Sequence, residues 1–190
     1  MNLFVGNGMK WIVRTRSCYN LILFGYKSSG KTYFGKLLSQ ELGCGFVDTD
    51  QLVEDFYEKK FCKRLNCRQI SIQIGEEGFR QLERYVIDSL EGVTNTVIAV
   101  GGGVVLNPVN CDSLSRNGKF VYLEVEKKII KERIFREGVP SFLDSHNLER
   151  SFEAMHEKRK PIYENMGLFK VSVRGKTDRQ VLDELQKIVS

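Results

Sequence analysis

Several features that would place this chain in a special class are missing from its 190 residues. No apolar run approaches the length of about 18 residues that a membrane-spanning helix needs, so we expect no membrane partner. The five cysteines form no C-x-x-C pair and are odd in number, which indicates neither a zinc site nor a disulfide framework. Reduced thiols of this kind favour a cytoplasmic protein. His146 and His156 have no third ligand at metal spacing, and we expect both to lie at the surface or to cap helices.

Acidic residues are missing from the first forty positions, where Arg14 and Arg16 precede the first predicted strand. Such a start can be a targeting peptide, but the segment before the strand is short and holds only these two arginines. We therefore interpret residues 1–18 as an N-terminal extension, either an extra strand or a loose leader that begins at Met1 or Met9. The net charge of +5 suits a small anionic substrate and, with Lys and Arg spread along the chain, predicts no nucleic-acid partner.

What the chain does contain is a phosphate-binding loop. Residues 25–32 read GYKSSGKT and fit the pattern G-x-x-x-x-G-K-[ST] at each fixed position. The apolar run Leu21–Phe24 before the loop has the length of a buried strand, and the apolar residues after it recur at helical spacing as far as Leu42. Strand, loop and helix thus occur in the order that the motif requires, so the sequence predicts that the chain binds a nucleoside triphosphate.

The chemistry of this loop follows from its expected geometry. Gly25 and Gly30 can adopt backbone angles that turn consecutive N–H groups inward, and the helix N-terminus behind them adds partial positive charge. Lys31 supplies a point charge for the β- and γ-phosphates, and the Thr32 hydroxyl is a hard oxygen ligand suited to Mg2+. We expect the nucleotide to contact the loop and its flank through Gly25, Lys27, Ser28, Ser29, Gly30, Lys31, Thr32 and Tyr33.

Two aspartates follow the second predicted strand, the short apolar pair Phe46-Val47. Asp48 and Asp50 are two positions apart, so both point to the same face while the chain stays extended. Ligands gather at the carboxyl ends of parallel strands, where one carboxylate could reach Mg2+ beside Thr32 and the other the phosphate acceptor. Alternatively, one of the aspartates serves as the N-cap of the helix predicted over Gln51–Lys60.

Two arginines and a glycine triplet are the candidates for holding that acceptor. Arg159 falls on the apolar stripe of its predicted helix, where a permanent charge needs a partner such as an anion, unless its head reaches solvent. Arg80 lies beside the stripe of an earlier helix, with Glu76 as a surface partner or Glu83 as the group that holds it toward a ligand. The triplet Gly101–Gly103 ends a buried strand and indicates close approach to bare backbone, with a plain flexible turn as the alternative.

Strands and helices alternate along the whole chain, with no repeat and no linker. This order predicts a single α/β domain over residues 1–190, with helices on both faces of a parallel sheet in three layers. The predicted strands are 21–24, 46–47, 97–100, 120–125 and 169–173. The first predicted helix follows Thr32, and the next three cover 51–60, 76–90 and 126–136. A fifth helix includes Leu148 and is kinked or ended by Pro161, and a sixth is capped by Thr177 and Gln180. Residues 137–147 lack periodicity and have Gly and Pro near their start, which predicts a mobile lid.

Together these motifs resemble shikimate kinase over about residues 20–189. The resemblance rests on the phosphate loop, DTD at 48–50, GEEGFR at 75–80 with Glu83, GGG at 101–103 and RKPIY at 159–163, in the order of the family. It implies a nucleoside-monophosphate-kinase-like P-loop fold with a five-stranded parallel sheet in the order 2-3-1-4-5. It also implies transfer of the ATP γ-phosphate to the 3-hydroxyl of shikimate in aromatic amino acid biosynthesis, with Mg2+ as the cofactor.

Position by position, the resemblance implies a role for each motif residue. Asp50 would bind the shikimate hydroxyls and orient or deprotonate the attacking one, with Lys31 as the second catalytic residue. Asp48 would reach Mg2+ through water, and Thr32 would ligate the ion directly. Arg80 and Arg159 would hold the carboxylate of shikimate, and the backbone of the glycine triplet would contact its ring hydroxyls. The implied substrate-binding residues are Asp50, Arg80, Gly101, Gly102, Gly103 and Arg159.

The lid departs from the family pattern. Many members carry an arginine there that contacts the ATP phosphates, but Val139 occupies its position, and residues 137–149 include no Lys or Arg. Either Arg136 or Arg133 substitutes from the end of the preceding helix, or Lys31 and Mg2+ carry the charge without help. We include Arg136 among the expected ATP-binding residues.

Two other functions remain open from the sequence. One is another kinase of the same fold that acts on gluconate or a nucleoside monophosphate, although the glycine triplet and paired aspartates do not suit a nucleobase. The other is a non-catalytic ATP-binding regulatory relative, which the missing lid arginine favours. We expect ATP and shikimate to be the partners of a chain that works as a monomer.

Overall fold

The centre of the molecule is a five-stranded parallel sheet. A computed structural model describes residues 19–116, 118–144, 146–166 and 169–189, so the predicted extension over residues 1–18 lies outside the described residues. The strand order is β2-β3-β1-β4-β5, and each neighbouring pair is parallel, which confirms the predicted fold class. The strands are β1 (Asn20–Phe24), β2 (Gly45–Asp48), β3 (Thr96–Ala99), β4 (Gly118–Glu124) and β5 (Phe169–Ser172).

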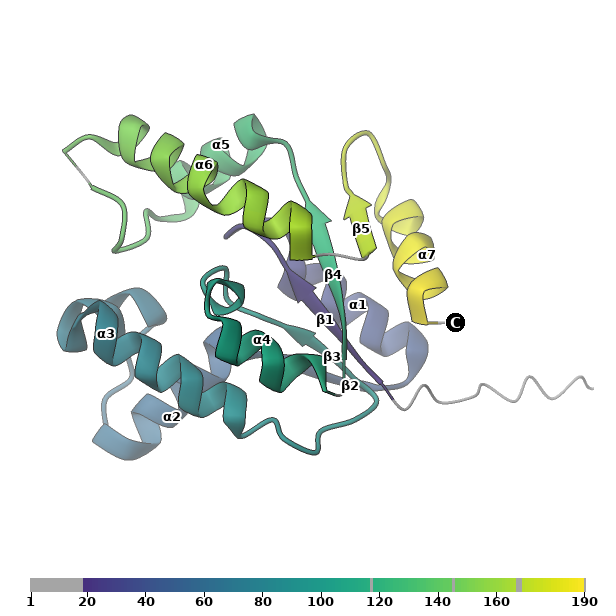
Figure 1. Cartoon of the computed structure of the whole chain (residues 1–190), viewed down its shortest axis with the longest axis horizontal. Helices are drawn as coiled ribbons and strands as arrows, with labels where there is room; N and C mark the ends of the chain where they lie inside the picture. Colours follow the sequence, from purple (N-terminus) through teal and green to yellow (C-terminus); the bar gives the residue numbers. More distant parts are fainter. Residues whose placement is uncertain (1–18, 117, 145, 167–168, 190) are drawn as a thin grey trace, which may run out of the picture.

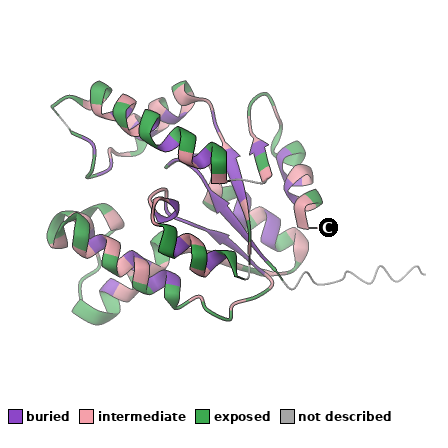
Figure 2. Cartoon of the chain, in the orientation of Figure 1, coloured by how far each residue is buried: buried purple, intermediate pink, exposed green. Residues whose placement is uncertain are grey.

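Helices cover both faces of this sheet (Figure 1). Side chains of β1 alternate between the faces: Leu21 and Leu23 pack with α1 (Lys31–Leu42) and α7 (Asp178–Val189). Ile22 and Phe24 point the other way, where the core is shared with Ile87 of α3 (Cys67–Asp88) and with three further helices. These are α4 (Pro108–Ser115), α5 (Lys127–Glu137) and α6 (Leu148–Met166). Because it is enclosed from both sides, β1 is buried along its whole length (Figure 2).

The helices α2 (Thr49–Phe61) and α3 (Cys67–Asp88) pack on each other beside the sheet, around a separate apolar cluster. The prediction for α3 was wrong at its start, because a first segment precedes the predicted one. The two segments meet at Gly75, where φ is 76° and ψ is 168°. The missed segment carries its own signal, since Asn66 and Gln69 cap each other's backbone N–H groups.

Other expectations for the helices were wrong or only partly right. Of the two alternatives for Pro161, a kink or a helix end, the structure excludes the end, because α6 continues through Pro161 to Met166. His156 is buried rather than at the surface, with its ring stacked on that of Tyr26 at 4.9 Å, since it follows Phe152 by one helical turn on the buried side. The helix α4 and the 3-10 turn η1 (Val104–Leu106) were not predicted, although proline at the first position of α4 is a start signal.

The strand order places three loops next to one another. The strands β2, β3 and β1 are neighbours, and each runs in the same direction. Their carboxyl ends lead into Asp48–Asp50, the glycine triplet and the phosphate loop, respectively. The sheet therefore brings the three motifs to one edge. Among the described residues, none of the helices is both long and apolar enough to span a membrane.

Candidate active site

The phosphate loop has the backbone geometry that the motif predicts. Gly25 and Gly30 have φ of 148° and 95°, and Ser28 is also in the left-handed region with φ of 63°. A β-carbon on Gly25 would lie 2.8 Å from the carbonyl oxygen of Leu123, so glycine is needed there for space as well as for conformation. Gly30 caps α1 without any side-chain hydrogen bond. The first N–H groups of α1 thus remain available to an anion.

Lys31 lies against this loop in the structure. Its ammonium donates hydrogen bonds to the carbonyl oxygens of Tyr26 at 2.8 Å and Gly25 at 3.2 Å. Desolvation lowers the pKa of Lys31 to about 8, and the carboxylates of Asp50 and Asp48 act in the opposite direction. The ammonium therefore stays charged at neutral pH, within reach of a phosphate on the loop.

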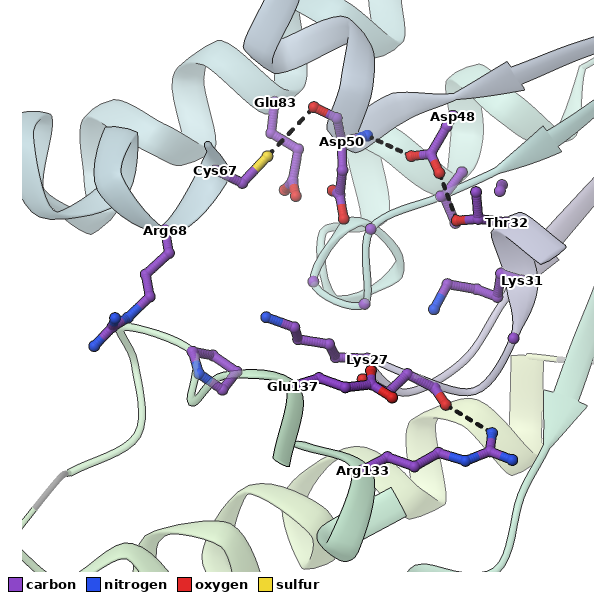
Figure 3. Close-up of a pocket in the computed structure, with 18 of the residues that line it drawn as sticks. Lys27, Lys31, Thr32, Asp48, Asp50, Cys67, Arg68, Glu83, Arg133 and Glu137 are labelled. Atoms are coloured by element: carbon purple, nitrogen blue, oxygen red, sulfur yellow. Dashed lines mark hydrogen bonds between the residues drawn. The ribbon is translucent and has the colours of Figure 1, made fainter. Parts of the chain in front are cut away.

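Asp48 caps a helix, as one alternative from the sequence held, and it also contacts Thr32. One of its oxygens accepts a hydrogen bond from the backbone N–H of Asp50 and so caps α2. The other accepts a hydrogen bond from the Thr32 hydroxyl at 2.6 Å. The expected extended arrangement of the two aspartates was wrong, because α2 begins at Thr49 and Asp50 is in its first turn. Both carboxylates nevertheless face the same cavity (Figure 3).

Asp48 and Thr32 form a pair of hard oxygen donors that fits Mg2+. Within the part of the chain that is described, no group of three His, Cys, Asp or Glu side chains could hold a metal by itself. This is compatible with Mg2+, which keeps several waters and takes further ligands from substrate phosphates.

Asp50 has the electrostatic setting of a general base. Its side chain lines the cavity, where neighbouring protein groups partly desolvate it. This desolvation and the nearby Asp48 carboxylate raise the pKa of Asp50 to about 6, while Lys31 and Lys27 oppose the rise. A carboxylate with such a pKa is ionised at neutral pH and is a better proton acceptor than an ordinary aspartate.

The glycine triplet forms the floor on which the acceptor-site side chains meet. A β-carbon on Gly101 would come within 2.5 Å of Oδ1 of Asp50. One on Gly103 would come within 2.9 Å of Cζ of Arg80. One on Gly102 would lie 3.4 Å from Nη1 of Arg159. These distances support close approach of side chains rather than a plain flexible turn.

The buried carboxylate of Glu83 orients the Arg80 guanidinium. Glu83 is 3% exposed, and both of its oxygens accept from Nη1 of Arg80 at 3.0 and 3.1 Å. Glu76 is a more distant partner at 3.7 Å, and its side chain is exposed. Burial raises the pKa of Glu83, and the Arg80 guanidinium opposes this. Of the two partners that the sequence offered, Glu83 therefore makes the closer contact.

Arg159 is 7% exposed and lies on the buried side of α6, as its stripe predicts. Its guanidinium stacks on the ring of Phe142 in the lid, with Cζ 4.6 Å from the ring centroid. Tyr163, one turn later, donates a hydrogen bond to the carbonyl oxygen of Gly102 at 2.5 Å. No role was predicted for Tyr163 or Phe142, although the spacing of Tyr163 from Arg159 already places it on the same helix face.

One cavity of about 680 Å³ joins the nucleotide and acceptor sides. Gly25 and Ser29 are buried in the loop behind it. The predicted site residues that line it are Lys27, Ser28, Gly30, Lys31, Thr32, Tyr33, Asp48, Asp50, Arg80, Gly101, Gly102, Gly103, Arg136 and Arg159.

The lid side of the cavity carries two arginines at the end of α5, and both line the cavity. Arg133 donates to the carbonyl oxygen of Ser28 at 3.0 Å and so contacts the phosphate loop directly. Arg136 pairs with Glu137 at 3.3 Å, and its side chain is 74% exposed. Arg133 was the alternative that the sequence left open, and in the structure it is the one that touches the loop.

A phosphate loop that faces an arginine-lined acceptor pocket, at the end of a sheet of this order, defines a P-loop kinase for small molecules. Within that class the chain belongs to the shikimate kinase family, whose family model matches residues 27–190. The shikimate kinase of Microcystis aeruginosa is 38% identical over 144 residues, 76% of this chain and 72% of that protein. The shikimate kinase of Caldanaerobacter subterraneus is 32% identical over 87% of this chain and 93% of its own length.

Solved structures agree with this assignment. Shikimate kinase from Acinetobacter baumannii, in complex with shikimate, superimposes with a TM-score of 0.79 at 25% identity. The superposition covers 92% of this chain and 94% of that one.

The setting of Asp50 predicts its titration. In carbon-detected NMR of the carboxyl groups, we expect Asp50, assigned with Asp50→Asn, to titrate near pH 6, with the carboxylate above that pH. Asp48→Asn removes a neighbouring negative charge while keeping a good N-cap, and should lower the pKa of Asp50. Titration of Asp50 near its ordinary value of about 4, with no response to Asp48→Asn, would contradict this description of the site.

Proposed function

We propose that this chain transfers the γ-phosphoryl group of ATP to the 3-hydroxyl of shikimate. The observation that carries the proposal is the convergence of Asp50, Arg80 and Arg159 on the glycine triplet, in the same cavity as the phosphate loop. Shikimate is a small acid with several hydroxyls, so it needs cationic forks for its carboxylate and acceptors for its hydroxyls. Membership of the shikimate kinase family supports the same reaction.

Arg80 and Arg159 would hold the carboxylate of the acceptor. Glu83 keeps the Arg80 guanidinium in place, and the Phe142 ring does the same for Arg159. Because neither arginine has to be ordered when the substrate arrives, less of the binding energy is spent on immobilising side chains. The bare backbone of the triplet leaves room for the ring hydroxyls between them.

Asp50 would accept the proton of the attacking hydroxyl. With a pKa of about 6 it is ionised at neutral pH, and its position beside Gly101 faces the acceptor. Phosphoryl transfer leaves little covalent work to the protein, so positioning and charge stabilisation account for most of the catalysis.

The nucleotide would lie on the loop, with its β- and γ-phosphates on the N–H groups before α1 and on Lys31. Thr32 would ligate Mg2+ directly and Asp48 would hold it through water. When bound, Mg2+ neutralises charge on the β- and γ-phosphate oxygens. The tie between the Thr32 hydroxyl and Asp48 fixes both donors before the ion arrives.

We propose further that the chain works as a monomer in the cytoplasm on these two small molecules. The described cysteines, Cys44, Cys62, Cys67 and Cys111, are free thiols, as a reducing compartment favours. The residues of the candidate site come from one chain, so a second copy is not needed to complete it.

Replacement of the base tests the proposed reaction. Asp50→Asn removes the proton acceptor with little change of shape and should lower kcat by roughly 10²–10⁴. Asp55→Asn, at an exposed position of the same helix, is the matched control and should keep the rate within about twofold. ADP release is measured with shikimate, gluconate or AMP as the acceptor. Release that does not depend on shikimate, or an unchanged rate in Asp50→Asn, would refute the assignment.

Because Gly103 contacts Arg80, a substitution at this glycine should change the binding of shikimate and not that of ATP. Gly103→Ala places a β-carbon against the Arg80 guanidinium and should displace it, which raises the KM for shikimate by about 10- to 100-fold, the range for loss of a charged hydrogen bond. The KM for ATP should stay the same, because the phosphate loop is untouched. Steady-state kinetics with each substrate varied in turn distinguish the two. Equal changes in both constants would mean that position 103 acts on the whole fold.

A further inference from the structure

Lys27 is a cation in the middle of the phosphate loop that extends into the cavity (Figure 3). The residue is exposed, and within the described part of the chain its ammonium has neither a hydrogen bond nor an ion pair. The motif leaves this position unrestricted, so the anion nest of the loop does not require a lysine here. An ammonium without a protein partner, in a cavity built for anions, is available to a ligand.

Other cations near the loop are already engaged. Lys31 donates to two loop carbonyls, and Arg133 donates to the carbonyl of Ser28. Arg136 pairs with its neighbour in the chain. Arg68 is also without a described partner, but it comes from α3 and lies across the cavity from Lys31 (Figure 3).

Lys27 stands at the boundary between the nucleotide and acceptor halves of the cavity. Its backbone nitrogen lies 3.6 Å from the place that a β-carbon on Gly102 would take, so the loop at this residue borders the glycine floor. Its positive field reaches Asp50, where it favours the ionised carboxylate. A γ-phosphoryl group in transit from the loop to a hydroxyl at Asp50 must cross this boundary.

The lid supplies no cation to that boundary. Residues 137–149 include no Lys or Arg, and the lid residues that line the cavity beyond Glu137 are Pro140, Ser141 and Phe142. Transfer spreads negative charge over the three equatorial oxygens of the phosphoryl group, and a cation that meets them stabilises the transition state. A cation that adds to Lys31 and Mg2+ would therefore come from an element other than the lid.

We propose that Lys27 is a catalytic residue whose ammonium contacts the equatorial oxygens of the γ-phosphoryl group during transfer. The inference rests on the proposed function. The hydroxyl oxygen of the acceptor forms a bond to the γ-phosphorus, and the bond from that phosphorus to the β–γ bridging oxygen breaks. ADP leaves with the electron pair, the hydroxyl proton passes to Asp50, and Lys27 forms no covalent bond.

Lys27→Met tests the proposal, since it keeps the length of the side chain and removes the charge. We expect kcat to fall by about 100- to 1,000-fold, at or just below the lower end of the effect of arginine fingers on phosphoryl transfer. ADP has no γ-phosphate, so its dissociation constant, measured by calorimetry, should change by less than about threefold. Lys27→Arg, which restores a cation, should recover a large part of kcat. Arg68→Met is the matched control, an equally unpaired cation of the same cavity, and should keep kcat within about threefold.

Three results would overturn the proposal. The first is an unchanged kcat in Lys27→Met. The second is recovery of that variant to the wild-type rate as the pH is raised from 6 to 7.5, because Lys27 would then act only by favouring the ionised form of Asp50. The third is an equal loss in Arg68→Met, which would indicate a diffuse field in place of a contact. Failure of the proposed function is distinct from these, since the wild-type chain itself would then release no ADP in response to shikimate.

Discussion

The site depends on one steric constraint, the absence of side chains at Gly101–Gly103. A β-carbon on either end glycine would fall on the atoms of Asp50 or Arg80. Removing three side chains where β3 ends lets a carboxylate and two guanidinium groups approach one patch of backbone from three different elements. The parallel sheet then determines what they face, because β1 delivers the phosphate loop beside them.

Some charged groups in this cavity have protein partners that hold them in place, and others do not. Arg80 has its own buried carboxylate, and Arg159 has an aromatic face. Both are held in place without full neutralisation, so they can still bind an anion. Asp50, by contrast, has a like charge beside it. Desolvation in the cavity and a like charge raise its pKa to about 6, which suits the proton acceptor that we propose.

The fold and most of the candidate site could be predicted because their signals are local. The phosphate loop, the DTD segment and the triplet are short motifs next to apolar strands, and strand order followed from the resemblance. What could not be predicted depends on contacts between distant segments. The stacking of His156 on Tyr26 joins residues 130 positions apart, as does the hydrogen bond from the Tyr26 hydroxyl to the backbone of His156. The apolar periodicity also failed to predict the first segment of α3, because the break at Gly75 interrupts the apolar stripe of the helix.

The most direct test is a crystal structure of the chain with shikimate and a non-hydrolysable ATP analogue bound together. We expect the shikimate carboxylate within hydrogen-bond distance of Arg80 and Arg159, and its 3-hydroxyl about 3 Å from Asp50, the range of a hydrogen bond. The γ-phosphate should lie on the same side of the triplet as that hydroxyl. Shikimate bound away from the triplet, or turned with its carboxylate toward the phosphate loop, would contradict the account.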